Sequence, residues 1–242
     1  MINIFISLCI GSGIFYLFFY FLPLYWPIGI ILGILAAGGM FFLLAKLIMK
    51  KITVIVEASS VELTKGQFSR AIILLEKGFK YKYRHPFIAA QLNSQIGVTY
   101  YYKRDFKKAE EYLKKGIASH YIGQCILGIL YMKKKDVEKM KKAFKAATRT
   151  SRKESIVWSL YAYCLNTMGK KDEAIQILNK GLKRLPKDEN IKANLKALQN
   201  NQRMKMRAYK DIWPAFMLEK NIIRQQPPRF ARGGGGRKSF RR

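Results

Sequence analysis

One stretch decides the fold of this chain: Trp158-Ser-Leu-Tyr-Ala-Tyr-Cys-Leu-Asn-Thr-Met-Gly-Lys-Lys-Asp-Glu-Ala-Ile-Gln-Ile-Leu-Asn-Lys-Gly-Leu-Lys-Arg-Leu-Pro186. Its aromatic start is followed four positions later by Ala162, and Ala174 comes five positions after Gly169. Small residues at Ala162 and Ala174 let two antiparallel helices approach closely. Gly169 suits the tight turn between them, and Pro186 ends the second helix. The stretch therefore predicts one antiparallel pair of helices.

The same order of residues recurs upstream. One copy contains Gly97, Tyr100, Arg104-Asp105-Phe106, Ala109, Leu113 and Gly116. A second contains Gly128, Tyr131, Lys135-Asp136-Val137, Met140, Phe144 and Ala147, and a weaker one contains Gly66-Gln67-Phe68, Ala71, Leu75 and Gly78. The equivalent small residues are spaced by 31 residues from Gly97 to Gly128 and by 34 from Gly128 to Ala162. Self-similarity at such a period indicates a helical repeat array.

Over about residues 52–188 these copies resemble the tetratricopeptide repeat, whose unit has about 34 residues. Met140 stands where that family prefers Ala, and only the last copy has both the Trp and the terminal Pro. The resemblance implies an all-α solenoid of about four helix pairs. A helix from Asp188 to about Gln202 is expected to cap it, because the last repeat must not leave its apolar face in water.

The N-terminal part has a different character, since residues 1–45 contain no Lys, Arg, Asp or Glu. Two apolar runs, 3–22 and 28–49, are each about long enough to cross a membrane. The segment 23–27 separates them with two prolines, a Tyr and a Trp. We therefore expect a transmembrane hairpin. A cleaved signal peptide needs a basic start that this chain lacks, and one span with a re-entrant segment is the other alternative.

Positive charge gives the hairpin an orientation. Lys46, Lys50 and Lys51 close the second run and the turn is neutral, so the positive-inside rule puts both termini in the cytoplasm of a multi-pass protein of the cell membrane. Gly29 and Gly33 are spaced by four, which favours close helix packing within the hairpin or, alternatively, a homodimer contact.

The expected domains are a hairpin over 1–51, a solenoid with its cap over 52–202 and a basic tail over 203–242. No Pro or turn signal separates Met49 from Gln67, so the second apolar helix could run directly into the first repeat. The β-formers at 54–56 leave open a break near Lys51–Thr53.

The repeat family usually binds partners through a concave face lined by the first helix of each pair. The resemblance places these residues on that face: Ser94, Val98, Tyr101, Tyr102, Cys125, Ile129, Met132, Lys133, Ser159, Tyr163 and Asn166. This row is apolar and aromatic, so the Lys/Asn/Arg carboxylate clamp of chaperone-binding relatives is not carried over. The groove suits an apolar or aromatic peptide, although some of these residues could be solenoid core.

The body and tail are strongly basic. Residues 52–202 hold 30 Lys/Arg and 13 Asp/Glu, and residues 203–242 hold 12 and 2. A solvated surface, anionic lipid, RNA or an acidic protein would each account for this charge. In the tail, Trp213, Phe216 and Leu218 are expected to dock in the groove or on the leaflet. Beyond them, residues 225–242 should be disordered.

That end of the tail combines Arg with Gly and Phe, like segments that bind single-stranded nucleic acid. Its basic residues are Arg229, Arg232, Arg237, Lys238, Arg241 and Arg242. Solvation and lipid contact are the alternative roles.

Enzyme chemistry is not indicated. The sequence has no phosphate loop, nucleophile elbow or apolar pair of carboxylates. Cys9, Cys125 and Cys164 have no ligand spacing, and His85 and His120 are isolated, so neither a metal nor a cofactor is predicted. The sequence favours a membrane-anchored adaptor for a protein or peptide partner at the cytoplasmic face. The alternative is a membrane tether for RNA, the ribosome or anionic lipid.

Overall fold

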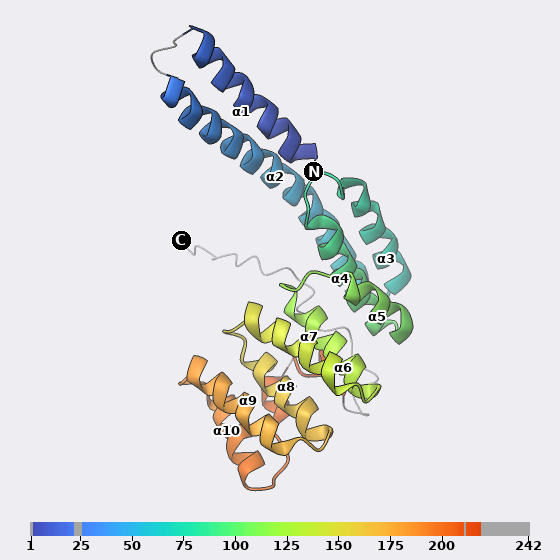
Figure 1. Cartoon of the computed structure of the whole chain (residues 1–242). Coiled ribbons are helices and arrows are strands. Elements are labelled where there is room, and N and C mark those ends of the chain that lie inside the picture. The colour runs from blue at the N-terminus through green and yellow to red at the C-terminus, as the bar shows by residue number, and fades with distance from the viewer. Residues whose placement is uncertain (1, 22–25, 211, 219–242) are drawn as a thin grey trace, which may run out of the picture.

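The computed structural model describes residues 2–21, 26–210 and 212–218, and these ranges contain helices but no strand. The helices are α1 (Ile2–Phe21), α2 (Trp26–Thr64), α3 (Phe68–Lys77), α4 (Ile88–Tyr102), α5 (Phe106–Lys114), α6 (Tyr121–Lys133), α7 (Val137–Thr150), α8 (Ser155–Thr167), α9 (Lys171–Arg184) and α10 (Glu189–Gln199). The predicted all-α class is confirmed. Figure 1 shows α1 and the first part of α2 projecting as a hairpin from one end of the stacked helices.

The hairpin packs through small residues. A Cβ added to Gly11 would lie 2.7 Å from the carbonyl oxygen of Gly33, and one added to Gly33 would lie 2.7 Å from that of Gly11. Gly29 lies in the same way against the side chain of Phe18. Both helices are long and apolar enough to cross a membrane. Gly29 and Gly33 face α1, as the main prediction of packing within the hairpin requires, and nothing supports the alternative homodimer contact through them.

Helix α2 is continuous over 39 residues, or about 58 Å at 1.5 Å per residue. It passes Lys51–Thr53 without a break, and its C-terminal part packs against α3. Ile52 is fully buried in a cluster with Ile72 and Leu75 of α3. This packing outweighs the weak helix propensity of the β-branched residues that follow. The apolar hairpin and the first helix pair therefore share one helix.

The remaining helices form successive antiparallel pairs. The pairs α2–α3, α4–α5, α6–α7 and α8–α9 each pack closely, and α10 packs on α9 and α8. This agrees with the predicted four pairs and cap. The spacing from Gly97 to Gly128 is only 31 residues because α5 is short. Helix α5 has nine residues, whereas α7 and α9 have fourteen each.

Large side chains of second helices fill positions where first helices are small. A Cβ on Gly97 would lie 2.7 Å from Leu113, and one on Gly128 would lie 2.5 Å from the ring of Phe144. The turns also repeat, since Gly66, Arg104, Lys135 and Gly169 all have φ between 60° and 75°. Each of these left-handed residues separates the two helices of one pair.

Candidate functional site in the concave groove

The inner layer of the solenoid consists of the first helices, with α4 against α6, α6 against α8 and α8 against α10. The structure places the expected groove residues at different depths in this layer. Ser94, Val98, Tyr101, Cys125, Ile129, Met132 and Ser159 are buried; Tyr102, Tyr163 and Asn166 are half-buried; and Lys133 is exposed. Ser94 faces the α5–α6 connection, where its Oγ accepts from the Ile117 N–H at 2.9 Å. It therefore supports the fold there.

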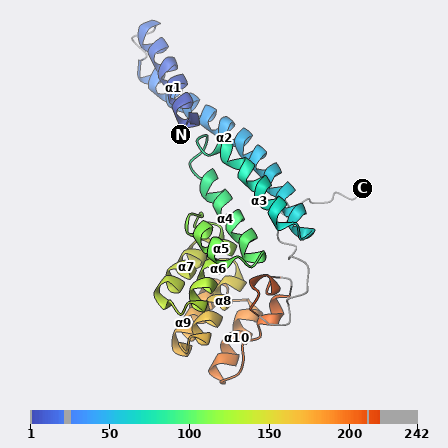
Figure 2. The same ribbon diagram turned by 90° about the vertical axis from the view of Figure 1, so that its right-hand side faces the viewer.

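The chain itself occupies this groove. We call residues 203–210 and 212–218 the strap; it contains two short 3-10 helices, Met206–Tyr209 and Pro214–Phe216. Met206, Tyr209, Trp213 and Phe216 are each at most 8% exposed, and all join the main core cluster with residues of α4, α6 and α8. Figure 2 shows the strap, in red, beside α8 and α10. The groove is filled by an aromatic segment.

A polar network fixes the first half of the strap. The Tyr209 hydroxyl lies 2.8 Å from Ser155 Oγ and 2.7 Å from Ser159 Oγ, both on α8. On α10, Oδ1 of the fully buried Asn194 accepts from the Lys205 N–H at 2.7 Å. Its Nδ2 donates to Ser159 Oγ at 3.3 Å. These bonds satisfy polar groups that burial would otherwise leave unpaired at a cost in free energy.

Aromatic contacts hold the second half. The Trp213 ring meets Tyr163 of α8 edge-on, with centroids 5.1 Å apart. The Tyr101 hydroxyl of α4 donates to the Phe216 carbonyl oxygen at 2.5 Å. Burial raises the pKa of Tyr101, so this phenol remains a neutral donor. Of the three expected docking residues, Trp213 and Phe216 are buried against the groove, and Leu218 is half-buried.

The comparison with known families follows this repeat geometry. The tetratricopeptide repeat family matches residues 90–119, 123–154 and 156–188. Residues 90–188 of the chain therefore consist of tetratricopeptide repeats. The three matches correspond to α4–α5, α6–α7 and α8–α9, and such repeats generally act in protein–protein interaction. No curated protein sequence matches this tetratricopeptide-repeat protein.

Burial shifts the pKa values of several groups in and beside the groove. Burial raises the pKa of Cys125 and of Cys164, so both thiols stay protonated and unreactive. Partial desolvation beside the Phe106 ring also lowers the pKa of Lys133, whose ammonium lies 4.6 Å from the ring centroid of Phe106. Across the described residues no group of three or more His, Cys, Asp or Glu could hold a metal ion.

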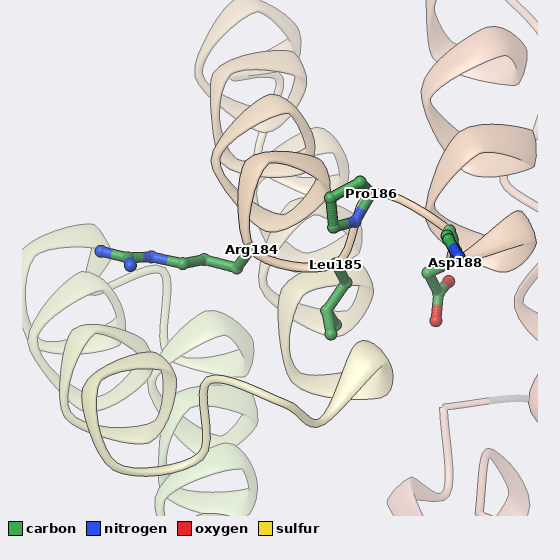
Figure 3. Close-up of a pocket in the computed structure, with 5 residues that line it drawn as sticks. Arg184, Leu185, Pro186 and Asp188 are labelled. Carbon is green, nitrogen blue, oxygen red and sulfur yellow. The ribbon is translucent and has the colours of Figure 1, made fainter.

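An open pocket of about 430 Å³ lies at the α9–α10 connection, lined by residues 184–188 (Figure 3). The Arg184 side chain extends away from Pro186 and Asp188. Because one short turn supplies the whole lining, no groups from different elements converge there. This pocket therefore lacks the arrangement of a catalytic site.

Sequence reasoning named Ser159 and Tyr163 of α8 as groove residues. It missed two further partners of the strap, Ser155 on α8 and Asn194 on α10. One signal was available in Asn194, a polar residue between Ile191 and Leu198 on the apolar face of α10. A buried Asn at such a position needs partners, and the strap supplies the Lys205 N–H. The basic residues named for the tail, Arg229 to Arg242, lie outside the described residues.

Proposed function

We propose that this protein is a membrane-anchored tetratricopeptide scaffold. It binds an extended aromatic segment of a protein partner in the concave groove, in the place that its own strap takes. The preferred ligand carries aromatic residues at the spacing of Tyr209, Trp213 and Phe216. The protein is held at the cell membrane by the α1–α2 hairpin, with the repeats and both termini in the cytoplasm.

One observation carries this proposal: the groove already holds a peptide segment. The strap is bound through side-chain pockets, through a backbone carbonyl at Phe216 and through a backbone N–H at Lys205. Tetratricopeptide repeats generally hold protein segments, and an intramolecular ligand of this kind competes at the high effective concentration of a short tether. A partner segment must therefore match or exceed the strap in its contacts.

Binding in trans tests the groove. In the full chain in detergent, Trp213→Ala together with Phe216→Ala should release the strap. A fluorescent peptide of residues 203–218 should then bind this variant at least about tenfold more tightly than the intact chain, because its tethered competitor is weakened. Anisotropy gives the affinity. Ser159→Leu added to the released variant is the control and should reduce binding, because it removes a partner of Tyr209. Equal, weak binding to both folded proteins would contradict the proposal.

The topology has a separate test. Reporter fusions placed after Lys51 and at the C-terminus should both be active only in the cytoplasm, because the basic residues 46, 50 and 51 lie at the end of the second apolar run. Activity outside the cytoplasm from either fusion would refute this orientation.

A second candidate is a nucleic-acid tether, which the excess of Lys and Arg over acidic residues in the body favours. Phosphate contacts weaken by orders of magnitude over a few-fold increase in salt, whereas an apolar groove contact does not. Pull-downs from solubilised membranes at low and high salt separate the two. Recovery of RNA at low salt, abolished by deleting 225–242, would favour the tether.

A further inference from the structure

The packing of α1 on α2 shows where along α2 the apolar layer ends and the repeats begin. Gly11 lies opposite Gly33, so in an antiparallel pair Ile2, nine residues earlier, is level with Phe42, nine residues later. Helix α1 has 20 residues, about 30 Å, which equals the thickness of a hydrocarbon core. The edge of the apolar layer nearest the repeats therefore lies at Ile2 and Phe42.

The connection between α3 and α4 lies beside Ile2 and Phe41, at this edge of the apolar layer. The Ile2 N–H donates to the Tyr83 carbonyl oxygen at 2.9 Å. The His85 ring stacks on Phe41 of α2 with centroids 6.1 Å apart. Two independent contacts thus place residues 83–85 at the boundary, beside the end of α1 and against α2.

The side chains at this boundary are aromatic and cationic. Tyr83 and Phe87 are 61% and 58% exposed, and the ammonium of Lys82 lies 4.8 Å from the Tyr83 ring centroid. Lys51 and Lys80 both lie over the Tyr81 ring, at 5.9 and 5.0 Å. Exposed aromatic rings beside Lys and Arg are characteristic of membrane–water interfaces.

No acidic residue balances this charge locally. The chain has no Asp or Glu in residues 1–56 or in residues 77–104. In the described part of the chain, no ion pair involves the cations of the boundary, which are Lys46, Lys50, Lys51, Lys80, Lys82 and Arg84. All six are exposed. Lys46, Lys50 and Lys51 follow Phe42 by about 6–14 Å along α2. The six unneutralised cations therefore form a belt for anions on the repeat side of the boundary.

We propose that these six cations, with Tyr83 and Phe87, form an interfacial collar that binds the headgroups of anionic phospholipids. The aromatic side chains insert at the headgroup level, and the ammonium and guanidinium groups bind lipid phosphates. The collar rests on the proposed anchoring of the hairpin. It adds a lipid preference that a neutral anchor lacks, and it holds the first repeat against the membrane surface.

Lipid selectivity tests the collar in the full chain reconstituted in mixed phosphatidylcholine and phosphatidylglycerol bilayers. Electron paramagnetic resonance of spin-labelled lipids measures the fraction of each lipid held at the protein. The wild type should prefer phosphatidylglycerol roughly threefold or more at low salt, since each nearby cation attracts the anionic surface. The preference should fall in 0.5 M salt because exposed charges are screened.

The triple variant Lys80→Gln, Lys82→Gln and Arg84→Gln should bring the preference close to one. The control is Lys180→Gln, Lys183→Gln and Lys187→Gln, which removes the same charge from exposed positions on α9 and the turn after it. It should keep the wild-type preference. Equal loss in both variants, or no preference in the wild type, would overturn the collar.

Carbonate extraction separates this result from the anchoring. The wild type and both variants should stay in the membrane pellet, because the hairpin alone anchors them. A pelleted wild type without lipid preference overturns the collar and leaves the anchor standing. Release of the wild type into the supernatant overturns both.

Discussion

At the residue scale, the repeats depend on single contacts between a glycine of one helix and a large side chain of the next. Gly128 of α6 receives the ring of Phe144 from α7, which is fully buried and stacks on Tyr161 at 5.0 Å. Protein interiors have little free volume, so even one methyl group at such a contact displaces its neighbour.

Gly128→Ala should therefore destabilise the solenoid by about 1–3 kcal/mol, although Ala is the better helix former. Urea unfolding of the full chain in detergent, followed by far-ultraviolet circular dichroism, measures the loss. Phe144→Leu should partly relieve the clash, so the double variant should lose less than the sum of the single losses. Strict additivity would mean that the two positions do not touch.

The surroundings of His120 predict how the stability of the protein depends on pH. Its Nδ1 accepts from the Gly123 N–H at 3.1 Å and caps α6. Burial lowers the pKa of His120 to about 4 from an ordinary 6.5. Between pH 6.5 and about 4, His120 binds a proton in the unfolded chain but not in the folded chain. The free energy of unfolding therefore falls as the pH drops from about 6.5 toward 4.

The full effect corresponds to about 3 kcal/mol. His120→Asn keeps a capping oxygen without a proton to bind. Thermal unfolding at pH 7 and pH 5 should therefore show a larger loss in the wild type than in this variant. The same pH dependence in both proteins would contradict the role of His120.

At the element scale, the turns within the helix pairs share one backbone geometry. Gly66 and Gly169 have φ of 75°, and Arg104 and Lys135 take φ of 68° and 60° at the equivalent positions. A left-handed backbone costs an L-residue about 1–2 kcal/mol, and glycine does not bear this cost. After Arg104, the Asp105 side chain accepts from the Lys108 N–H and caps α5.

Arg104→Gly should accordingly stabilise the protein by about 0.5–1 kcal/mol, after the larger chain entropy of glycine in the unfolded state is counted. The neighbouring Lys103 has φ of −68°, so Lys103→Gly gives the matched control and should destabilise. Urea midpoints of the two variants should move in opposite directions. Movement in the same direction would exclude a relief of backbone strain at Arg104.

The helix pairs could be predicted from the sequence because their signals are local. Small residues, turn residues and aspartate caps recur at fixed spacing, and each specifies the chain within one pair. The course of α2 was left open because β-branched residues weaken a helix that only the packing of Ile52 secures. Docking of the tail in the groove stayed one of two alternatives, the other being docking on the leaflet. The choice depends on pairs such as Tyr101 with Phe216, which are separated by 115 residues.

At the scale of the whole molecule, the strap changes how the repeats depend on one another. In a simple solenoid each repeat contacts only its neighbours, so the ends can unfold separately. Here one segment is bonded to α4 through Tyr101, to α8 through Ser159 and to α10 through Asn194. The strap therefore links helices that do not belong to adjacent pairs.

Trp213→Ala with Phe216→Ala should consequently reduce the cooperativity of unfolding as well as the stability. Replacing two buried aromatic residues costs about 3–5 kcal/mol each in a rigid core. The larger change should be in hydrogen exchange, where α4 and α10 should share one opening free energy in the wild type and separate in the variant. Leu218→Ala, at a half-buried position, should leave the two helices coupled. If α4 and α10 already exchange independently in the wild type, the strap is a passive cover, and its release would expose the groove without loosening the solenoid.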